Sequence, residues 1–157
     1  MARYITHPSA RSLIAGGAIA GIIGGCIFHA FLFAIGRAHF PSTYEWIASG
    51  LLGDVAYDGS LAWAGILIHF AIAIVAATIY AYVAQVVGLL GRPFVGTLVL
   101  GIAMNGVMDL VKYVRWDTPL PTTWPGIGVL LLAHVVFFAA PIAFFLSKYE
   151  RVPVPYA

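Results

Sequence analysis

The chain has 157 residues, of which 62% are hydrophobic and only 9% carry a charge. A soluble globule of this size needs more polar surface than these residues provide, so the composition excludes a soluble protein and predicts a membrane protein. The net charge of +2 also argues against nucleic acid as a partner, because binding nucleic acid requires a dense basic patch.

Four apolar runs are long enough to cross a hydrocarbon core, which takes roughly 20 helical residues. They cover about residues 13–35, 62–87, 94–114 and 127–146. Only short connections remain. We therefore predict one membrane domain over residues 1–157, an all-α bundle of four transmembrane helices in contact with membrane lipid.

The distribution of basic residues predicts the orientation of this bundle. An even number of spans places both termini on the same side of the membrane. Most of the cations lie at the two termini and in the second loop, at Arg3, Arg11, Arg92, Lys148 and Arg151. Because loops on the cytoplasmic side carry an excess of Lys and Arg, we expect both termini to be cytoplasmic.

A row of small residues marks one face of the first predicted span. Gly17, Gly21 and Gly25 are spaced by four residues, and the second span carries a matching row at Ala73, Ala77 and Ala81. Such rows allow helix backbones to approach closely and pack by van der Waals contact. We interpret them as packing within one chain, with a homodimer interface as the alternative.

The loop between the first two spans contains an amphipathic pattern. Ser42 and Glu45 have the spacing of a capping box, and apolar residues follow at helical intervals, which predicts a helix over about residues 43–56. Trp46 and Tyr57 suit the headgroup region. We therefore expect an interfacial helix that covers the outer end of the bundle.

Polar residues inside the apolar runs provide the main functional clue. His29, His69, Asp109 and His134 come from four different spans, and each lies within roughly 10 Å of the outer end at 1.5 Å of helix rise per residue. Burying such groups in a membrane is costly, so they mark candidate functional sites. Asn105 and Lys112 extend this layer into a polar track along the third span.

Several chemistries use a layer of this kind. The first is a transition metal or haem b, because imidazole, carboxylate and thiolate groups are common ligands. The candidate ligands are His29, His69, His134, Asp109 and Cys26, and Arg37 and Arg115 could pair with haem propionates. The alternatives are proton or solute handling by an oligomer, and hydrogen bonds that only fix the helix register.

The chain contains no nucleotide-binding or serine-nucleophile motif, so an enzymatic role is less favoured than a binding role. A non-catalytic subunit or assembly partner of a larger membrane complex is a further alternative, suggested by the short loops and the glycine row. The single cysteine, Cys26, excludes a disulfide within the chain.

Several segments resemble a widespread group of small, uncharacterised four-span bacterial membrane proteins. The likeness is carried by IASGLLG at 47–53 with Ala56, Tyr57 and Gly59, by HF at 69–70 with Ile72, Ala73 and Tyr80, by RP at 92–93, and by His134 with PIA at 141–143. It implies the four-span fold and the bacterial inner membrane. It also implies that His69 and His134 belong to the shared scaffold, whereas His29, Asp109 and Lys112 are additions in this chain.

Overall fold

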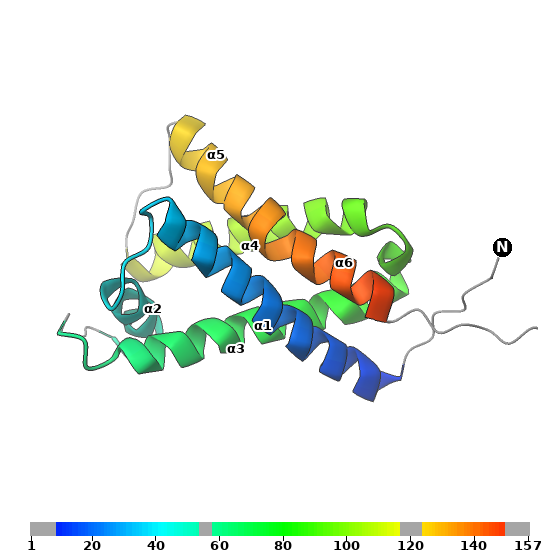
Figure 1. Ribbon diagram of the computed structural model, residues 1–157, viewed down its shortest axis with the longest axis horizontal. Coiled ribbons are helices and arrows are strands. Elements are labelled where there is room, and N and C mark those ends of the chain that lie inside the picture. The colour runs from blue at the N-terminus through cyan, green and yellow to red at the C-terminus, as the bar shows by residue number, and fades with distance from the viewer. Residues whose placement is uncertain (1–8, 54–57, 117–123, 150–157) are drawn as a thin grey trace, which may run out of the picture.

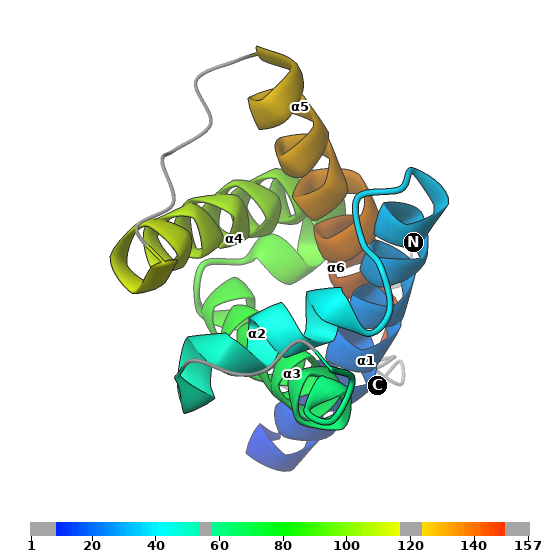
Figure 2. The same ribbon diagram turned by 90° about the vertical axis from the view of Figure 1, so that its left-hand side faces the viewer.

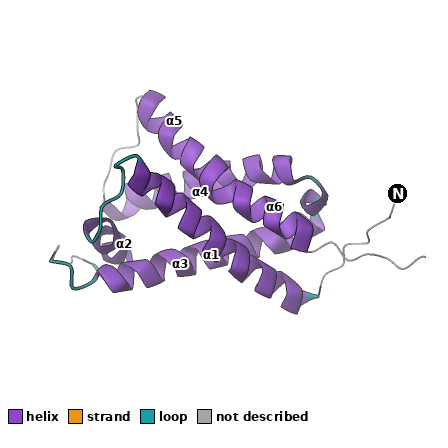
Figure 3. Ribbon diagram, viewed as in Figure 1, coloured by secondary structure: helices purple, strands orange, loops and turns teal. Residues whose placement is uncertain are grey.

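The computed structural model describes residues 9–53, 58–116 and 124–149, and these residues form helices and connections without a strand. Four helical segments are long and apolar enough to cross a membrane, which agrees with the predicted all-α bundle (Figures 1 and 3). They are α1 (Ala10–Ala34), α3 (Ala62–Val86), α4 (Pro93–Trp116) and a fourth segment composed of α5 (Trp124–Leu132), η2 (Ala133–Ala139) and α6 (Ala140–Tyr149).

The predicted boundaries agree with these helices to within about three residues. Helix α1 begins earlier than predicted, at Ala10, because the hydroxyl of Ser9 caps it by accepting a hydrogen bond from the backbone N–H of Ser12 at 3.1 Å. A side-chain acceptor at this position satisfies one of the free N–H groups of the first turn. The charged and polar residues Arg11 and Ser12 therefore belong to the helix.

The glycine row of α1 packs directly on α3, as the sequence predicted for contacts within the chain. A Cβ built on Gly17 would lie 2.6 Å from the Cα of Thr78, and one built on Gly21 would lie 2.6 Å from the carbonyl oxygen of Ala73. The two helices are antiparallel, so each later glycine of α1 contacts an earlier residue of α3. The two backbones are therefore in contact with no layer of side chains between them.

The other face of α1 packs on the fourth segment, and α4 completes the bundle from the far side. Gly24 lies against the side chain of Ile142, and Gly101 of α4 lies against the backbone of Val135. In contrast, α3 and α4 have few contacts, although the short helix η1 (Leu89–Gly91) joins them at one end. The two helices diverge from that connection toward the opposite end of the bundle (Figures 1 and 2).

Helix α2 (Ser42–Leu52) lies across this opposite end, which we call the α2 end (Figure 2). The predicted helix is thus present, but the predicted capping box is wrong. Pro41 occupies the N-cap position, and the carboxylate of Glu45 is fully buried, where it accepts a hydrogen bond from the backbone N–H of Gly59. Glu45 therefore ties the loop before α3 to α2 instead of capping its own helix.

The predicted C-terminal end of this helix falls on residues 54–56, which lie outside the described residues, as does Tyr57. The described helix ends at Leu52, and Gly53 follows with a φ of +90°. A positive φ of this size is unfavourable for residues with a side chain, so a glycine is required at this exit.

The fourth segment contains a π-helix at residues Ala133–Ala139. Pro141 follows two residues later and has no backbone N–H, so it cannot bond to the carbonyl of Phe137 four residues earlier. In π geometry that carbonyl can instead accept from residue 142, five positions on. This local change of helix type, which includes His134, was not predicted from the sequence.

We expect Gly65→Ala to destabilise the attachment of α2 to α3. A Cβ built on Gly65 overlaps the backbone carbonyl of Tyr44, so the two helices would have to separate, at a cost of about 1–3 kcal/mol typical of overpacking. Thermal unfolding of the purified protein measures this change. Gly106→Ala is the matched control, because no atom lies within 4 Å of its built Cβ, and equal melting temperatures for the two variants would contradict the close contact.

Candidate functional site

His29 and His69 form a contacting pair because Gly25 leaves room between α1 and α3. The Nε2 atom of His69 lies 3.2 Å from a Cβ built on Gly25, one turn before His29. The imidazole of His69 therefore lies over α1, where its ring centroid is 3.9 Å from that of His29 with an interplanar angle of 37°. Backbone contact between the helices thus brings two of the predicted site residues together.

Tyr44 of α2 connects this pair to the end of the bundle. Its hydroxyl lies 3.2 Å from Nδ1 of His29 in a buried hydrogen bond, and the two rings meet at 76°. Burial, and secondarily the neighbouring Cys26, raises the pKa of Tyr44 above its usual value. The phenol therefore stays protonated at neutral pH and can donate to His29.

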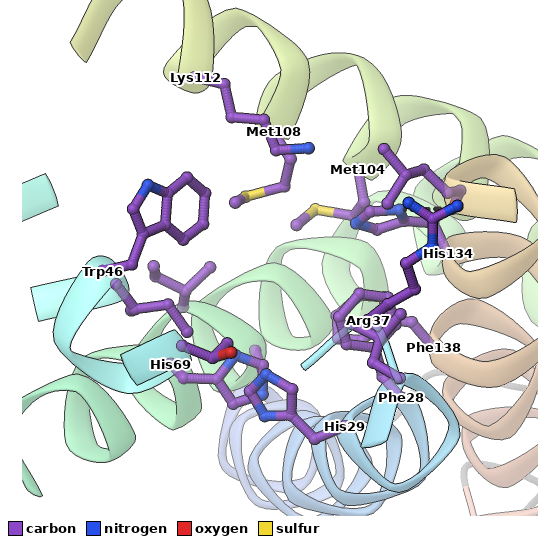
Figure 4. A pocket seen from close by; sticks show the side chains of 16 residues that line it. Phe28, His29, Arg37, Trp46, His69, Met104, Met108, Lys112, His134 and Phe138 are labelled. Atoms are coloured by element: carbon purple, nitrogen blue, oxygen red, sulfur yellow. Dashed lines mark hydrogen bonds between the residues drawn. The ribbon is translucent and has the colours of Figure 1, made fainter. Parts of the chain in front are cut away.

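His134 stands apart from this pair. Its Nδ1 atom lies 2.9 Å from the carbonyl oxygen of Leu130, and the residue is only 6% exposed. The ring of Phe28 lies between the histidines, with centroids 4.9 Å from His134 and 6.5 Å from His69 (Figure 4). The three histidines therefore lie around the same space without converging on one point.

That space is a cavity of about 230 Å³ at the α2 end. Its walls come from α1, α3, α4 and the fourth segment, and residues of α2 close its end (Figure 4). Most of the lining side chains are apolar, and the polar ones are basic or hydroxyl groups. The lining residues are Phe28, His29, Leu32, Arg37, Thr43, Trp46, Ile47, His69, Ile72, Ala73, Met104, Met108, Lys112, Leu130, His134 and Phe138.

On α4 the predicted polar track forms a local network beside this cavity. The carboxylate of Asp109 accepts a hydrogen bond from the side-chain amide of Asn105 at 2.9 Å and pairs with Lys112 at 3.3 Å. Of these three residues only Lys112 lines the cavity. Asp109 and Asn105 therefore affect the cavity indirectly, because Asp109 holds the ammonium group of Lys112.

Three other predicted site residues have different surroundings. Cys26 is exposed and does not line the cavity. Arg115 binds α2, with Nη2 donating to the carbonyl of Ser49 at 3.0 Å and Nε donating to that of Gly50 at 3.2 Å. Arg37 is exposed at the end of α1 but reaches the cavity lining.

The contact of Arg115 is part of a junction that fixes α2 to the end of α4. The indole rings of Trp46 and Trp116 stack with centroids 4.3 Å apart, and Nε1 of Trp116 donates to the hydroxyl of Ser49 at 2.9 Å. Trp46 also lines the cavity. We call Trp46, Ser49, Arg115 and Trp116 the α2–α4 junction. It holds α2 across the space that α3 and α4 leave open.

The sequence analysis did not single out the apolar cavity residues of α4. Met104 and Met108 line the cavity and form a row with Lys112 at four-residue spacing. Residues four apart lie on the same face of a helix, so the assignment of Lys112 to the polar layer could also have identified Met104 and Met108 from the sequence. Phe28 carried no such signal, since it is one of many phenylalanines in apolar runs.

The arrangement does not support the expected transition-metal site. Among the described residues, no group of three or more His, Cys, Asp or Glu side chains could hold a metal ion. Phe28 separates His134 from the other two imidazoles, and Asp109 is engaged by Asn105 and Lys112. The residues that the layer brings together therefore do not fit a closed ligand set.

Haem b fits this geometry no better. Two axial imidazoles keep their coordinating nitrogens about 4 Å apart, at about 2 Å from the metal, with the rings directed away from each other. His29 and His69 instead have contacting rings, with no gap between them for a macrocycle. Arg115, expected beside a propionate, is occupied by the carbonyls of α2.

No protein-family model, curated protein or solved structure matches the chain.

We expect Arg115→Gln to loosen α2 without unfolding the bundle. The substitution removes the charge-assisted hydrogen bonds to two backbone carbonyls, which contribute roughly 1.5–3 kcal/mol when a donor is charged and less when it is exposed. Hydrogen exchange measured by mass spectrometry should rise in residues 42–52. Arg92→Gln, an exposed arginine at the opposite end, is the control and should leave exchange in α2 unchanged.

Proposed function

We propose that the chain is a multi-pass membrane protein whose cavity binds a small amphiphilic molecule. The observation that carries this proposal is a single cavity built from five helical elements, mainly apolar, with a few polar groups directed into it. Binding sites for small molecules have this composition, in which apolar walls provide affinity and isolated polar groups fix orientation.

The charges around the cavity favour a ligand whose polar end accepts hydrogen bonds or is negative. Lys112 and Arg37 belong to the lining, and none of the described lining residues is a carboxylate. Asp109 offsets part of the charge of Lys112 from outside the cavity. An ammonium has three donors, so Lys112 keeps donors for a ligand beyond the one directed at Asp109.

The volume limits the part of the ligand that is enclosed. A cavity of about 230 Å³ is smaller than the roughly 300–1,000 Å³ typical of drug-sized sites. At roughly 30 Å³ per water-sized group it accommodates about eight such groups. A short alkyl chain or one substituted ring with a polar end fits this space.

In this proposal the four long helices cross the inner membrane of a bacterium, with both termini in the cytoplasm and α2 at the outer surface. The cavity then lies in the outer half of the membrane, beneath α2. Solute handling was one of the alternatives raised by the polar layer, and the lining supports it better than a metal or haem. Membership of a larger complex stays a prediction that the cavity neither requires nor opposes.

The binding proposal is tested by filling the cavity from one side of α4. Wild-type protein in lipid nanodiscs is titrated with octanoate, octanol and octylamine by calorimetry, with empty nanodiscs as the blank. We expect saturable binding of at least one probe, and loss of that binding in Met108→Trp, because the larger ring occupies the cavity.

Val107→Trp is the matched control, because Val107 is the preceding residue and is 51% exposed away from the cavity. It should bind the probe as the wild type does. Absence of saturable binding for all three probes, or equal binding by both tryptophan variants, would remove the proposal.

A further inference from the structure

The hydrogen bond of His134 determines what its second nitrogen can do. A backbone carbonyl can only accept, so Nδ1 must carry the proton in the 2.9 Å contact with Leu130. The tautomer assigned from this bond leaves Nε2 of a neutral imidazole with a lone pair and no hydrogen. A neutral ligand beside Nε2 must therefore donate a hydrogen bond or a proton.

The neighbouring cations require a ligand group that accepts hydrogen bonds. Lys112 and Arg37 line the same cavity and can only donate. The charges nearest His134 on α4 are Lys112 and its partner Asp109, while α1 and α3 contribute the imidazoles of His29 and His69 across the ring of Phe28. A ligand group that complements the cavity must donate a proton to His134 and accept hydrogen bonds from Lys112 and Arg37.

A carboxylic acid meets both demands with one functional group. Its O–H can donate to Nε2, and once that proton has moved, two oxygens are available to an ammonium and a guanidinium. Charge-assisted hydrogen bonds from Arg and Lys to carboxylate are roughly twice as strong as neutral ones. An alcohol donates but forms no anion here, and an amine adds a positive charge beside two cations.

We propose that the cavity takes up a short monocarboxylic acid in its protonated form and transfers the carboxyl proton to Nε2 of His134, leaving the carboxylate between Lys112 and Arg37. The O–H bond of the acid breaks, the N–H bond of the imidazolium forms, and no electrons are transferred. The uncharged acid reaches the cavity through an apolar environment at far lower cost than the anion. This inference names the ligand class of the proposed function and rests on it.

Proton counting separates this inference from binding alone. Octanoate is titrated into the protein in nanodiscs at pH 7.5 by calorimetry in two buffers with different ionisation enthalpies. Because octanoate is ionised in solution at this pH, we expect about one proton taken up per molecule bound, with at least tenfold weaker binding of octanol. His134→Gln should abolish the proton uptake and weaken octanoate binding at least tenfold.

His39→Gln is the control, because His39 is exposed and does not line the cavity. It should retain both the affinity and the proton uptake. If His134→Gln fails to fold, the proton count of the wild type still tests uptake of the acid, and His134→Asn replaces His134→Gln as the test of the proton acceptor.

Each outcome has a distinct meaning. Saturable binding without proton uptake, or octanol binding as tightly as octanoate, overturns the carboxylic acid and leaves the binding cavity in place. Proton uptake that persists in a folded His134→Gln variant overturns the role of His134. Failure of all probes to bind removes the proposed function together with this inference.

Discussion

The backbone contact between α1 and α3 is the constraint on which the site depends. Because Gly17 and Gly21 lie directly on α3, the two helices have one register and one separation. Gly25 continues this row and leaves just enough space for the imidazole of His69 to reach His29. A longer side chain at any of these three positions would separate the helices and with them the two histidines.

The cavity exists because some pairs of helices pack closely and others have few contacts. The fourth segment contacts both α1 and α4, whereas α3 and α4 have few contacts with each other. The space between them at the far end is closed by α2, which Gly65 seats on α3 and the α2–α4 junction holds on α4. The bundle is therefore closed tightly at one end, and at the other end a bound amphipathic helix completes it.

The sequence predicted the helices well and the site only in part. Apolar runs and the glycine row predicted the four long helices and the contact of α1 with α3, because both depend on patterns along one helix. The common level of His29, His69 and His134 was also readable from distances along each span. Their separation by Phe28, the outward direction of Cys26 and the use of Arg115 to bind α2 depend on rotation of the helices and on contacts between distant segments. Single-sequence periodicity does not specify these features.

The π-helix at Ala133–Ala139 changes how the two halves of the fourth segment are rotated relative to each other about the helix axis. In an uninterrupted α-helix, His134 and Pro141 are seven residues apart and lie on nearly the same face, since two turns take about 7.2 residues. The wider π turn rotates these two residues away from a common face. The half of the segment that faces the cavity and the half that packs into the glycine-lined core can therefore be oriented independently. One proline thereby lets a single segment satisfy the tightly packed core and an open chamber without a break in the chain.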